Sequence, residues 1–590
     1  MFNTFLRVGS RSVFKGLQVP QYEVAAQRLA SFTVRNILNE TSDETGTLFT
    51  RFAKHVAFEL QKDAPIVPTM IRYADYFPIS DIRYLHRELA RLSPDQLPAL
   101  IVYAVNYRAG ADLNKYATLL NELDATAVRL LPRMELDTIL RTLYAFLYLM
   151  PNWITKIDFY NAAMKHIIAV GIAEDTPKEK FVQICFYLGL EKNRRATNVV
   201  SFSNFLKDHL ETYLPKLTTL DLIIVANAAF KTSTRIESDT FNSRLIEETL
   251  KLSLNDSTND ALLVTLIKAM RFQRIHSKEV CEHLTKYCSE DIVERLQLRG
   301  CIHLFAYFAD NLWDDENSIE SVIDQCFQRI VSSRKFDMHA ENVRCKDIAT
   351  YLWCCAQLNC KLSTSDLQLI ESTLLNKVDQ NEFKNFVDQL VDSCLSLWSL
   401  GYKSRELIEE AVNLKLNARF TNKKDLRDLP KVESRFQVLL SAISIEEPKW
   451  QFKNIKGSTE ARIDKEAPPY LLKDRQVLVD MSKKIAEHSD VQSTQLVCPI
   501  SGINIPSILV SYKEPANLRV FVELIPKEQQ LRFSKSPIGL IGLKTRLLSS
   551  LGYKVITITE SQYNEDEISL AFLAHNIEDS EIPKTQSLNA

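Results

Sequence analysis

The chain has 590 residues, a length that corresponds to about four domains of typical size. Its 72 Lys and Arg against 74 Asp and Glu residues give a formal net charge of −2, so binding to nucleic acid or to an anionic membrane would need a local basic patch. Together the 13 glycines and 20 prolines are less than half of the roughly 12% expected from average usage, which indicates few turns. The balance of 46% hydrophobic and 25% charged residues excludes collagen-like and broadly disordered chains.

The first residues resemble a targeting segment. Arg7, Arg11 and Lys15 lie among serines and apolar residues at helical spacing, and the first acidic residue is Glu23. Such a basic, amphipathic and acid-poor start is typical of a mitochondrial transit peptide, which we expect within residues 1–40. The alternative is an ordinary first helix with a basic face.

From about residue 80 to residue 415, apolar residues recur in pairs of helical segments separated by short polar turns. The first helix of each pair ends in an aromatic residue or leucine, and four of the seven intervals between these marks are 42 residues. The marks are Tyr107, Leu149, Leu188, Phe230, Phe272, Phe308, Leu358 and Leu400. A period near forty predicts an α-solenoid over residues 41–416, in which neighbouring helix pairs bury each other's apolar faces.

The pattern changes after residue 416. Residues 417–471 contain one expected helix (431–446) and a polar stretch, so we interpret them as a connector. Residues 472–576 combine a helix (477–488), strands at 507–512, 518–525 and 554–559, and a leucine-rich helix within 537–553. A helix between two strands predicts a crossover in a small α/β domain, and residues 577–590 form a polar tail.

The run GLIGLKTRLLSSLGYKVITIT (539–559), preceded by RVFVELIP (519–526), resembles the RAP domain of organellar RNA proteins. Its most specific part is Lys544-x-Arg546-Leu547-Leu548 with Leu551-Gly552-Tyr553. The segment 426–450 is similar to one that accompanies RAP domains in the FAST kinase family. This resemblance implies a restriction-endonuclease-like fold and an RNA-binding protein of the mitochondrial matrix.

Enzymatic motifs are missing from the sequence. It has no G-x-G-x-x-G, H-R-D or D-F-G, and Gly539-x-x-Gly542-x-Lys544 lacks Walker spacing and falls in an expected helix. Where nucleases of the related fold hold Mg²⁺, the sequence offers Glu523 without a Lys two residues later. We therefore predict no catalytic residues.

The spacing of the cysteines and the length of the apolar stretches also bear on the class of protein. The 11 cysteines lack framework spacing, which favours buried free thiols, and Cys281-x-His283 with Cys288 lacks the paired spacing of zinc sites. We predict no metal and no cofactor. No apolar stretch reaches the length of a membrane span.

Basic and aromatic residues of the C-terminal domain are the candidate RNA contacts, because cations neutralise phosphates and exposed rings stack on unpaired bases. The candidates are Arg519, Lys527, Arg532, Lys535, Lys544, Arg546, Tyr553 and Lys554. Basic residues near turns of the array form a second, weaker candidate track, namely Lys192, Arg194, Arg195, Arg271, Arg274, Arg334 and Lys335.

Taken together, the sequence predicts a mostly α protein that binds single-stranded mitochondrial RNA and acts without catalysis in RNA processing, stability or translation. One alternative is a scaffold that grips proteins of a mitochondrial ribosome or an RNA-processing complex. A second alternative is a metal-dependent RNA nuclease centred on Glu523.

Overall fold

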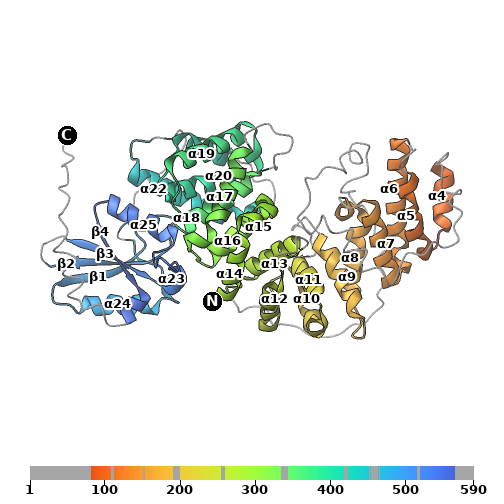
Figure 1. Ribbon diagram of the computed structural model, residues 1–590, viewed down its shortest axis with the longest axis horizontal. Coiled ribbons are helices and arrows are strands. Elements are labelled where there is room, and N and C mark those ends of the chain that lie inside the picture. The colour runs from red at the N-terminus through yellow and green to blue at the C-terminus, as the bar shows by residue number, and fades with distance from the viewer. Residues whose placement is uncertain are drawn as a thin grey trace, which may run out of the picture. The chain divides into compact units, whose positions relative to one another are not determined.

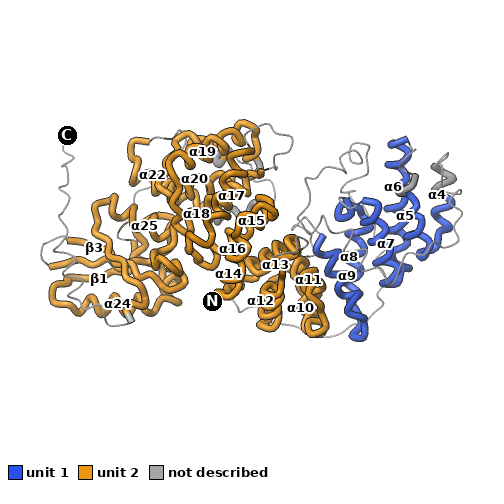
Figure 2. Tube along the Cα trace, in the orientation of Figure 1, with its two compact units in different colours: residues 1–192 blue, residues 193–590 orange. Residues whose placement is uncertain are grey.

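The computed structural model describes residues 82–107, 112–150, 153–190, 199–253, 259–333, 343–417, 423–450, 452, 463, 465–513 and 518–564. The expected transit peptide and the polar tail lie outside these ranges. The protein is mostly helical and carries a mixed four-stranded sheet near its C-terminus, as predicted (Figure 1). The chain forms two compact units, one up to Lys192 and one from Asn193 onwards (Figure 2).

The helices come in pairs, after a first helix α4 (Ile82–Arg91). We call the first helix of each pair the A helix; these are α5 (Leu97–Tyr107), α7 (Leu136–Leu149), α9 (Lys178–Leu190), α11 (Thr219–Lys231), α13 (Asn259–Gln273), α16 (Gln297–Asp310), α18 (Cys345–Gln357) and α20 (Val387–Ser399). The B helices are α6 (Leu113–Leu130), α8 (Asp158–Val170), α10 (Val199–Tyr213), α12 (Asp239–Lys251), α14 (Lys278–Thr285), α17 (Glu316–Ser332), α19 (Thr364–Asp379) and α21 (Arg405–Asn417). The expected helix-pair repeats are confirmed, and every register mark falls within two residues of the end of an A helix.

Burial explains why the two helix types differ in sequence. Within the second unit, neighbouring A helices pack on one another, and α16, α18 and α20 also pack on their own B helices. Consequently, α11 is buried continuously from Leu222 to Ala229, whereas α12 buries one stripe that includes Phe241 and Leu245. A helix in a middle layer must be apolar on almost all sides, and a helix in an outer layer needs only one apolar face.

Five A helices end in the same backbone motif, although the sequence has few glycines. A residue with φ between 54° and 85° follows each helix, and the next N–H donates to the carbonyl five residues before it at 2.8–3.0 Å. This is the Schellman arrangement, which satisfies carbonyls at a helix end and reverses the chain. The left-handed residues are Ser233, Arg274, Leu312, Asn359 and Gly401.

The expected connector contains a longer helix than predicted. Helix α22 (Lys423–Glu446) begins eight residues before the expected start at residue 431 and packs against α20. It therefore continues the row of A helices. Two short helices, α15 (Glu290–Arg295) and α23 (Pro469–Leu472), complete the connections.

The C-terminal domain has one strand more than the sequence predicted. Its strands are β1 (Val491–Val497), β2 (Ser507–Tyr512), β3 (Arg519–Ile525) and β4 (Lys554–Thr559), in the order β1-β2-β3-β4. The missed strand β1 pairs antiparallel with β2, and β2 pairs antiparallel with β3. Strands β3 and β4 are parallel and joined through α25 (Gly539–Ser550), which confirms the expected crossover.

Helices α24 (Gln476–Ala486) and α25 pack on opposite faces of this sheet. Leu478, Met481 and Ile485 of α24 form a core with alternate residues of all four strands, including Val520 and Val522 of β3. The other alternate residues of β3, Phe521 and Glu523, are buried on the face that carries α25. Helix α26 (Glu560–Asn564) follows β4. Within the described ranges, no helix is long and apolar enough to cross a membrane.

Candidate functional site

The C-terminal domain contacts the carboxyl ends of three successive A helices. At the end of α16, the Arg532 side chain donates through Nε to the carbonyl oxygen of Asn311 at 2.8 Å. The buried Asp314 accepts hydrogen bonds from the backbone N–H groups of Phe533 (2.8 Å) and Ser534 (2.9 Å). The Phe533 ring meets the Trp313 ring edge to face at 4.9 Å. This loop is therefore held by polar and aromatic contacts together.

The second contact lies at the end of α18. Asn359, the left-handed residue after this helix, donates from Nδ2 to the carbonyl oxygen of Pro537 at 2.8 Å. Two residues later, α25 begins so close to α18 that a Cβ atom on Gly539 would stand 1.9 Å from the carbonyl oxygen of Ala356. The amino end of one helix thus faces the carboxyl end of another, an arrangement in which the helix dipoles attract.

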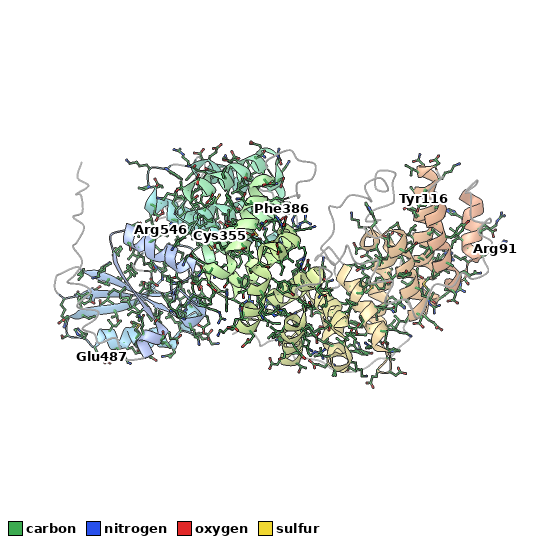
Figure 3. The ribbon with its side chains drawn as sticks, viewed as in Figure 1. Arg91, Tyr116, Cys355, Phe386, Glu487 and Arg546 are labelled. Atoms are coloured by element: carbon green, nitrogen blue, oxygen red, sulfur yellow. The ribbon has the colours of Figure 1, made fainter. Side chains whose placement is uncertain are left out.

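Arg546 makes the third contact, at the end of α20. Its guanidinium donates to the carbonyl oxygens of Trp398 (2.6 Å) and Ser399 (3.1 Å) and pairs with the buried carboxylate of Glu446 at 2.8 Å. Figure 3 labels Arg546 on α25. The last carbonyls of a helix have no partner within it and carry partial negative charge. Arg546 donates to two carbonyls at this end of α20 and joins the C-terminal domain to α20 and α22.

Lys544 lies on α25 and is wholly buried. Its ammonium donates to Glu523 at 2.8 Å and to the carbonyl oxygen of Ile505 at 2.8 Å, and the other Glu523 oxygen accepts from the Ser507 hydroxyl at 2.6 Å. Burial lowers the pKa of Lys544 and outweighs the opposing attraction of Glu523. The group therefore ties α25 to β2 and β3 through a buried ion pair.

Glu523 thus has partners that the sequence did not indicate. Each of its carboxylate oxygens already accepts a hydrogen bond, and one of the donors is a cation. Among the described residues, no cluster of three or more His, Cys, Asp or Glu side chains is placed to hold a metal ion. The eleven cysteines are free and buried, as expected.

The other candidate cations fall into two places. Lys527 and Lys535 are exposed and line one surface hollow after the end of β3. Lys535 also donates from Nζ to the Arg532 carbonyl oxygen at 2.7 Å. Arg519 and Lys554 begin β3 and β4 at the opposite end of the sheet, separated from the first place by roughly 20 Å of strand. Near Lys554, the Tyr553 ring packs edge to face on Phe521 at 5.1 Å, and both rings are at least partly buried.

The eight predicted residues therefore do not form one RNA-binding patch. Lys544 is buried in an ion pair, while Arg532 and Arg546 donate to backbone carbonyls of the helical array. The motif that resembles a RAP domain uses its most distinctive cations for folding and docking. Of the candidate track in the array, Arg271 pairs with Asp310 at 2.6 Å and Arg274 is exposed, and the other members lie outside the described residues.

A different cationic cluster lies on the A helices of the second unit. Its members, which we call the A-row cations, come from α11, α13, α16 and the start of α18. They lie close enough to Lys268 or His303 to lower the pKa of that group. They are Lys231, Lys268, Arg271, Arg299, Arg344 and Lys346, and the imidazole of His303 lies among them. Burial and the neighbouring cations lower the pKa of Lys268 to about 7 and that of His303 well below its usual value.

Only Arg271 of this cluster was a sequence candidate. The sequence does contain a signal for Lys268, because this lysine interrupts the apolar run from Leu263 to Met270. A lysine in a buried helix segment costs free energy unless its ammonium reaches a surface or a partner. Arg299, Arg344 and Lys346 lie at helix starts, where basic residues are unfavourable near the positive end of the helix dipole.

Comparison with protein-family models and with curated proteins finds no match for this chain. Its function must therefore be inferred from the residues and contacts described above.

Gly539→Ala should separate α25 from α18, because the new Cβ would collide with a backbone oxygen that cannot rotate away. We expect a loss of about 1–3 kcal/mol in the free energy of unfolding, measured by urea denaturation. Gly542→Ala, in the same helix with nothing within 4 Å of its Cβ, is the matched control and should be neutral or slightly stabilising. Equal stability of the two variants would contradict the close approach.

Lys544→Met should destabilise the protein by about 3 kcal/mol or more, because it leaves the Glu523 carboxylate buried without its cation. Adding Glu523→Gln removes that uncompensated charge, so the double variant should be more stable than Lys544→Met alone. Urea denaturation of both variants and of the wild type measures the difference. A Lys544→Met protein as stable as the wild type would show that the ion pair does not hold α25.

Proposed function

We propose that this protein binds single-stranded RNA on the A-helix surface of its second unit and acts in mitochondrial RNA metabolism without cleaving RNA. The observation that supports this most strongly is the cluster of A-row cations, contributed by four A helices. The resemblance of residues 519–559 to the RAP domain points to the same class of ligand.

The electrostatics of the cluster favour an anionic ligand. Within the cluster, Arg271 pairs with Asp310 and Arg344 pairs with Asp347. Lys268 has no hydrogen bond or ion pair to the described residues, and the cations around it make its charged form unfavourable. A phosphate at this place would relieve the repulsion and restore the charge of Lys268.

The distribution of the cluster favours an extended polyanion over a single phosphate. Its members come from four A helices, each of which packs on the next, so the positive charge is spread over several repeats. Successive phosphates of a nucleic-acid strand can follow such a row, and each neutralised phosphate adds to the affinity.

The proposed role is binding and not cleavage. Glu523, the carboxylate on which a nuclease would depend, is 2% exposed and accepts hydrogen bonds from Lys544 and Ser507. A group held this way serves as a structural anion. Incubation of purified protein with RNA and Mg²⁺ tests this part of the proposal, and cleavage abolished by Glu523→Gln would overturn it.

The double variant Lys268→Gln, Lys346→Gln should weaken binding of a single-stranded 12-mer RNA by about tenfold and lower the salt dependence by more than about one unit of slope. Its thermal stability should not fall, because removing Lys268 relieves repulsion. Fluorescence anisotropy over a salt series measures the effect. The double variant Lys483→Gln, Lys484→Gln, with both changes at exposed positions of α24, is the control for the loss of two lysines and should bind as the wild type does.

Wild-type affinity of the double variant would remove the A-row cations from the proposal. Absence of RNA binding by the wild type at low salt, together with stable association with a protein complex, would favour the scaffold role instead.

Location in mitochondria is the second part of the proposal, and it depends on the sequence of residues 1–40. A fluorescent reporter carrying these residues should be imported into mitochondria, because a basic, amphipathic and acid-poor segment is read as an import signal. Replacing Arg7, Arg11 and Lys15 by Gln should leave the reporter in the cytosol. Equal import of both reporters, or of neither, would contradict a targeting role for this segment.

A further inference from the structure

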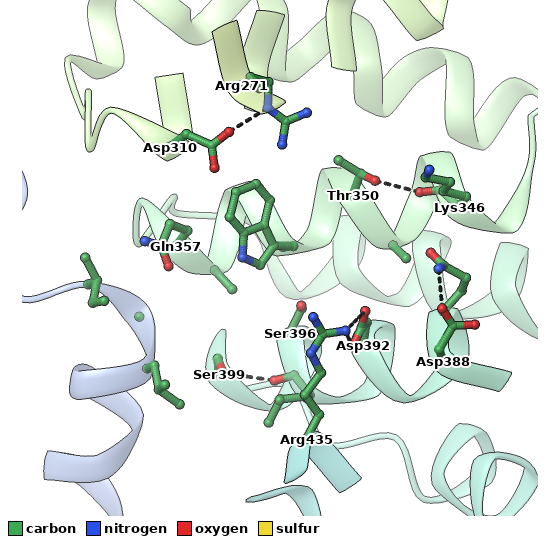
Figure 4. A pocket seen from close by; sticks show the side chains of 18 residues that line it. Arg271, Asp310, Lys346, Thr350, Gln357, Asp388, Asp392, Ser396, Ser399 and Arg435 are labelled. Carbon is green, nitrogen blue, oxygen red and sulfur yellow. Dashed lines mark hydrogen bonds and ion pairs between the residues drawn. The ribbon is translucent and has the colours of Figure 1, made fainter. Parts of the chain in front are cut away.

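Next to the A-row cations lies a cavity of about 610 Å³, which is within the size range of small-molecule and nucleotide sites. Its walls come from α13, α16, α18, α20 and α22, and the first residues of α25 close one side. Arg271 and Asp310 border it at one side, and Asp392 and Arg435 at the other (Figure 4). The C-terminal domain therefore completes a cavity that is formed mainly by the array.

The lining offers the groups that recognise a nucleobase. Trp353, which is partly exposed, supplies an aromatic face beside the Arg271 guanidinium, 6.0 Å from its ring centroid. The side-chain amide of Gln357 and the indole N–H of Trp353 have no hydrogen-bond partner among the described residues. The flat Trp353 ring can stack on the face of a base, and the polar groups beside it can hydrogen-bond to the edge of the base.

The charges of the lining fit a nucleotide rather than a small anion. Arg271 and Arg435 are already paired with Asp310 and Asp392, so this part of the cavity is close to neutral. Lys346 and Asp388 line the cavity as well, which brings its lining to three basic and three acidic side chains, and the other A-row cations lie beside it. A cavity that is close to neutral suits the uncharged base of a nucleotide, and the cations beside it suit the phosphate.

We propose that this cavity holds one unstacked base of the bound RNA, with the base against Trp353 and its phosphate toward Lys346 and the A-row cations. This inference rests on the proposed function, and it goes further in assigning a base-binding role to α18 and a composite site to the array and the C-terminal domain. Gln357 lies where it can contact the base edge, and Ile538 and Leu540 at the start of α25 limit the depth of the site.

The test uses the full chain and three variants. Trp353→Ala should weaken binding of a single-stranded 12-mer RNA about five- to a hundredfold, because one stacked base is lost. Trp353→Phe keeps an aromatic face and should retain most of the affinity. Tyr470→Ala removes an aromatic ring that is 71% exposed and does not line the cavity, and should leave binding unchanged.

Inorganic polyphosphate is the second probe, since it has phosphates but no bases. Its binding should be unaffected by Trp353→Ala and weakened by Lys268→Gln with Lys346→Gln. If that double variant loses RNA affinity while Trp353→Ala binds RNA as the wild type does, RNA binding stands and the base site is overturned. If the wild type binds no RNA, the proposed function itself fails. A nucleoside monophosphate that binds as tightly as the 12-mer would also overturn the proposal, because the cavity would then be a free-nucleotide site.

Crosslinking provides a readout that needs no variant, should Trp353→Ala fold poorly. RNA containing 4-thiouridine should crosslink to the wild-type protein within residues 346–357, as mapped by mass spectrometry. Crosslinks confined to β3 and β4 would contradict the base site.

Discussion

The C-terminal domain binds the carboxyl ends of three successive A helices, and this docking positions the rest of the domain. Arg532 binds a carbonyl after α16, Gly539 allows α25 to approach α18, and Arg546 binds carbonyls at the end of α20. Each contact joins a partly positive group to the partly negative end of a helix. Because the three helices are successive in the array, the contacts act together and fix the domain in one position against α16, α18 and α20.

This docking changes how the basic residues of the C-terminal motif are understood. A cation can bind a phosphate only if it is not already committed, and Lys544 and Arg546 are committed to Glu523 and to helix carbonyls. Lys268 differs, since burial and the neighbouring cations make its charged form unfavourable until an anion binds. We therefore propose that the array supplies the cations of the binding site and that the C-terminal domain completes its wall.

The sequence was sufficient for the architecture because architecture depends on periodic apolar patterns. Marks such as Phe230 and Phe308 locate the ends of A helices, and the strand-helix-strand order around α25 predicts a crossover. Strand β1 was missed because its residues Gln492, Ser493, Thr494 and Gln495 are polar, and it is stabilised by pairing with β2. The repeated left-handed turn was also hidden, since only Gly401 among its five residues is a glycine.

The site was harder to predict than the fold, for a physical reason. Whether Arg546 faces solvent or a helix end depends on residues about a hundred or more positions away, such as Glu446 and Trp398. The A-row cations likewise come together from four helices that are separated along the chain by about forty residues each. Local spacing identifies residue types with suitable chemistry, and tertiary packing decides which of them can reach a ligand.

Hydrogen exchange of the full chain with and without single-stranded RNA tests most directly whether α25 is docked on the array and whether RNA binds the A helices. We predict that the amides of α25 are protected in the free protein together with those of α18 and α20, and that RNA adds protection along α13, α16 and α18. Rapid exchange of α25 while α18 and α20 stay protected, or RNA-induced protection restricted to β3 and β4, would contradict the claim.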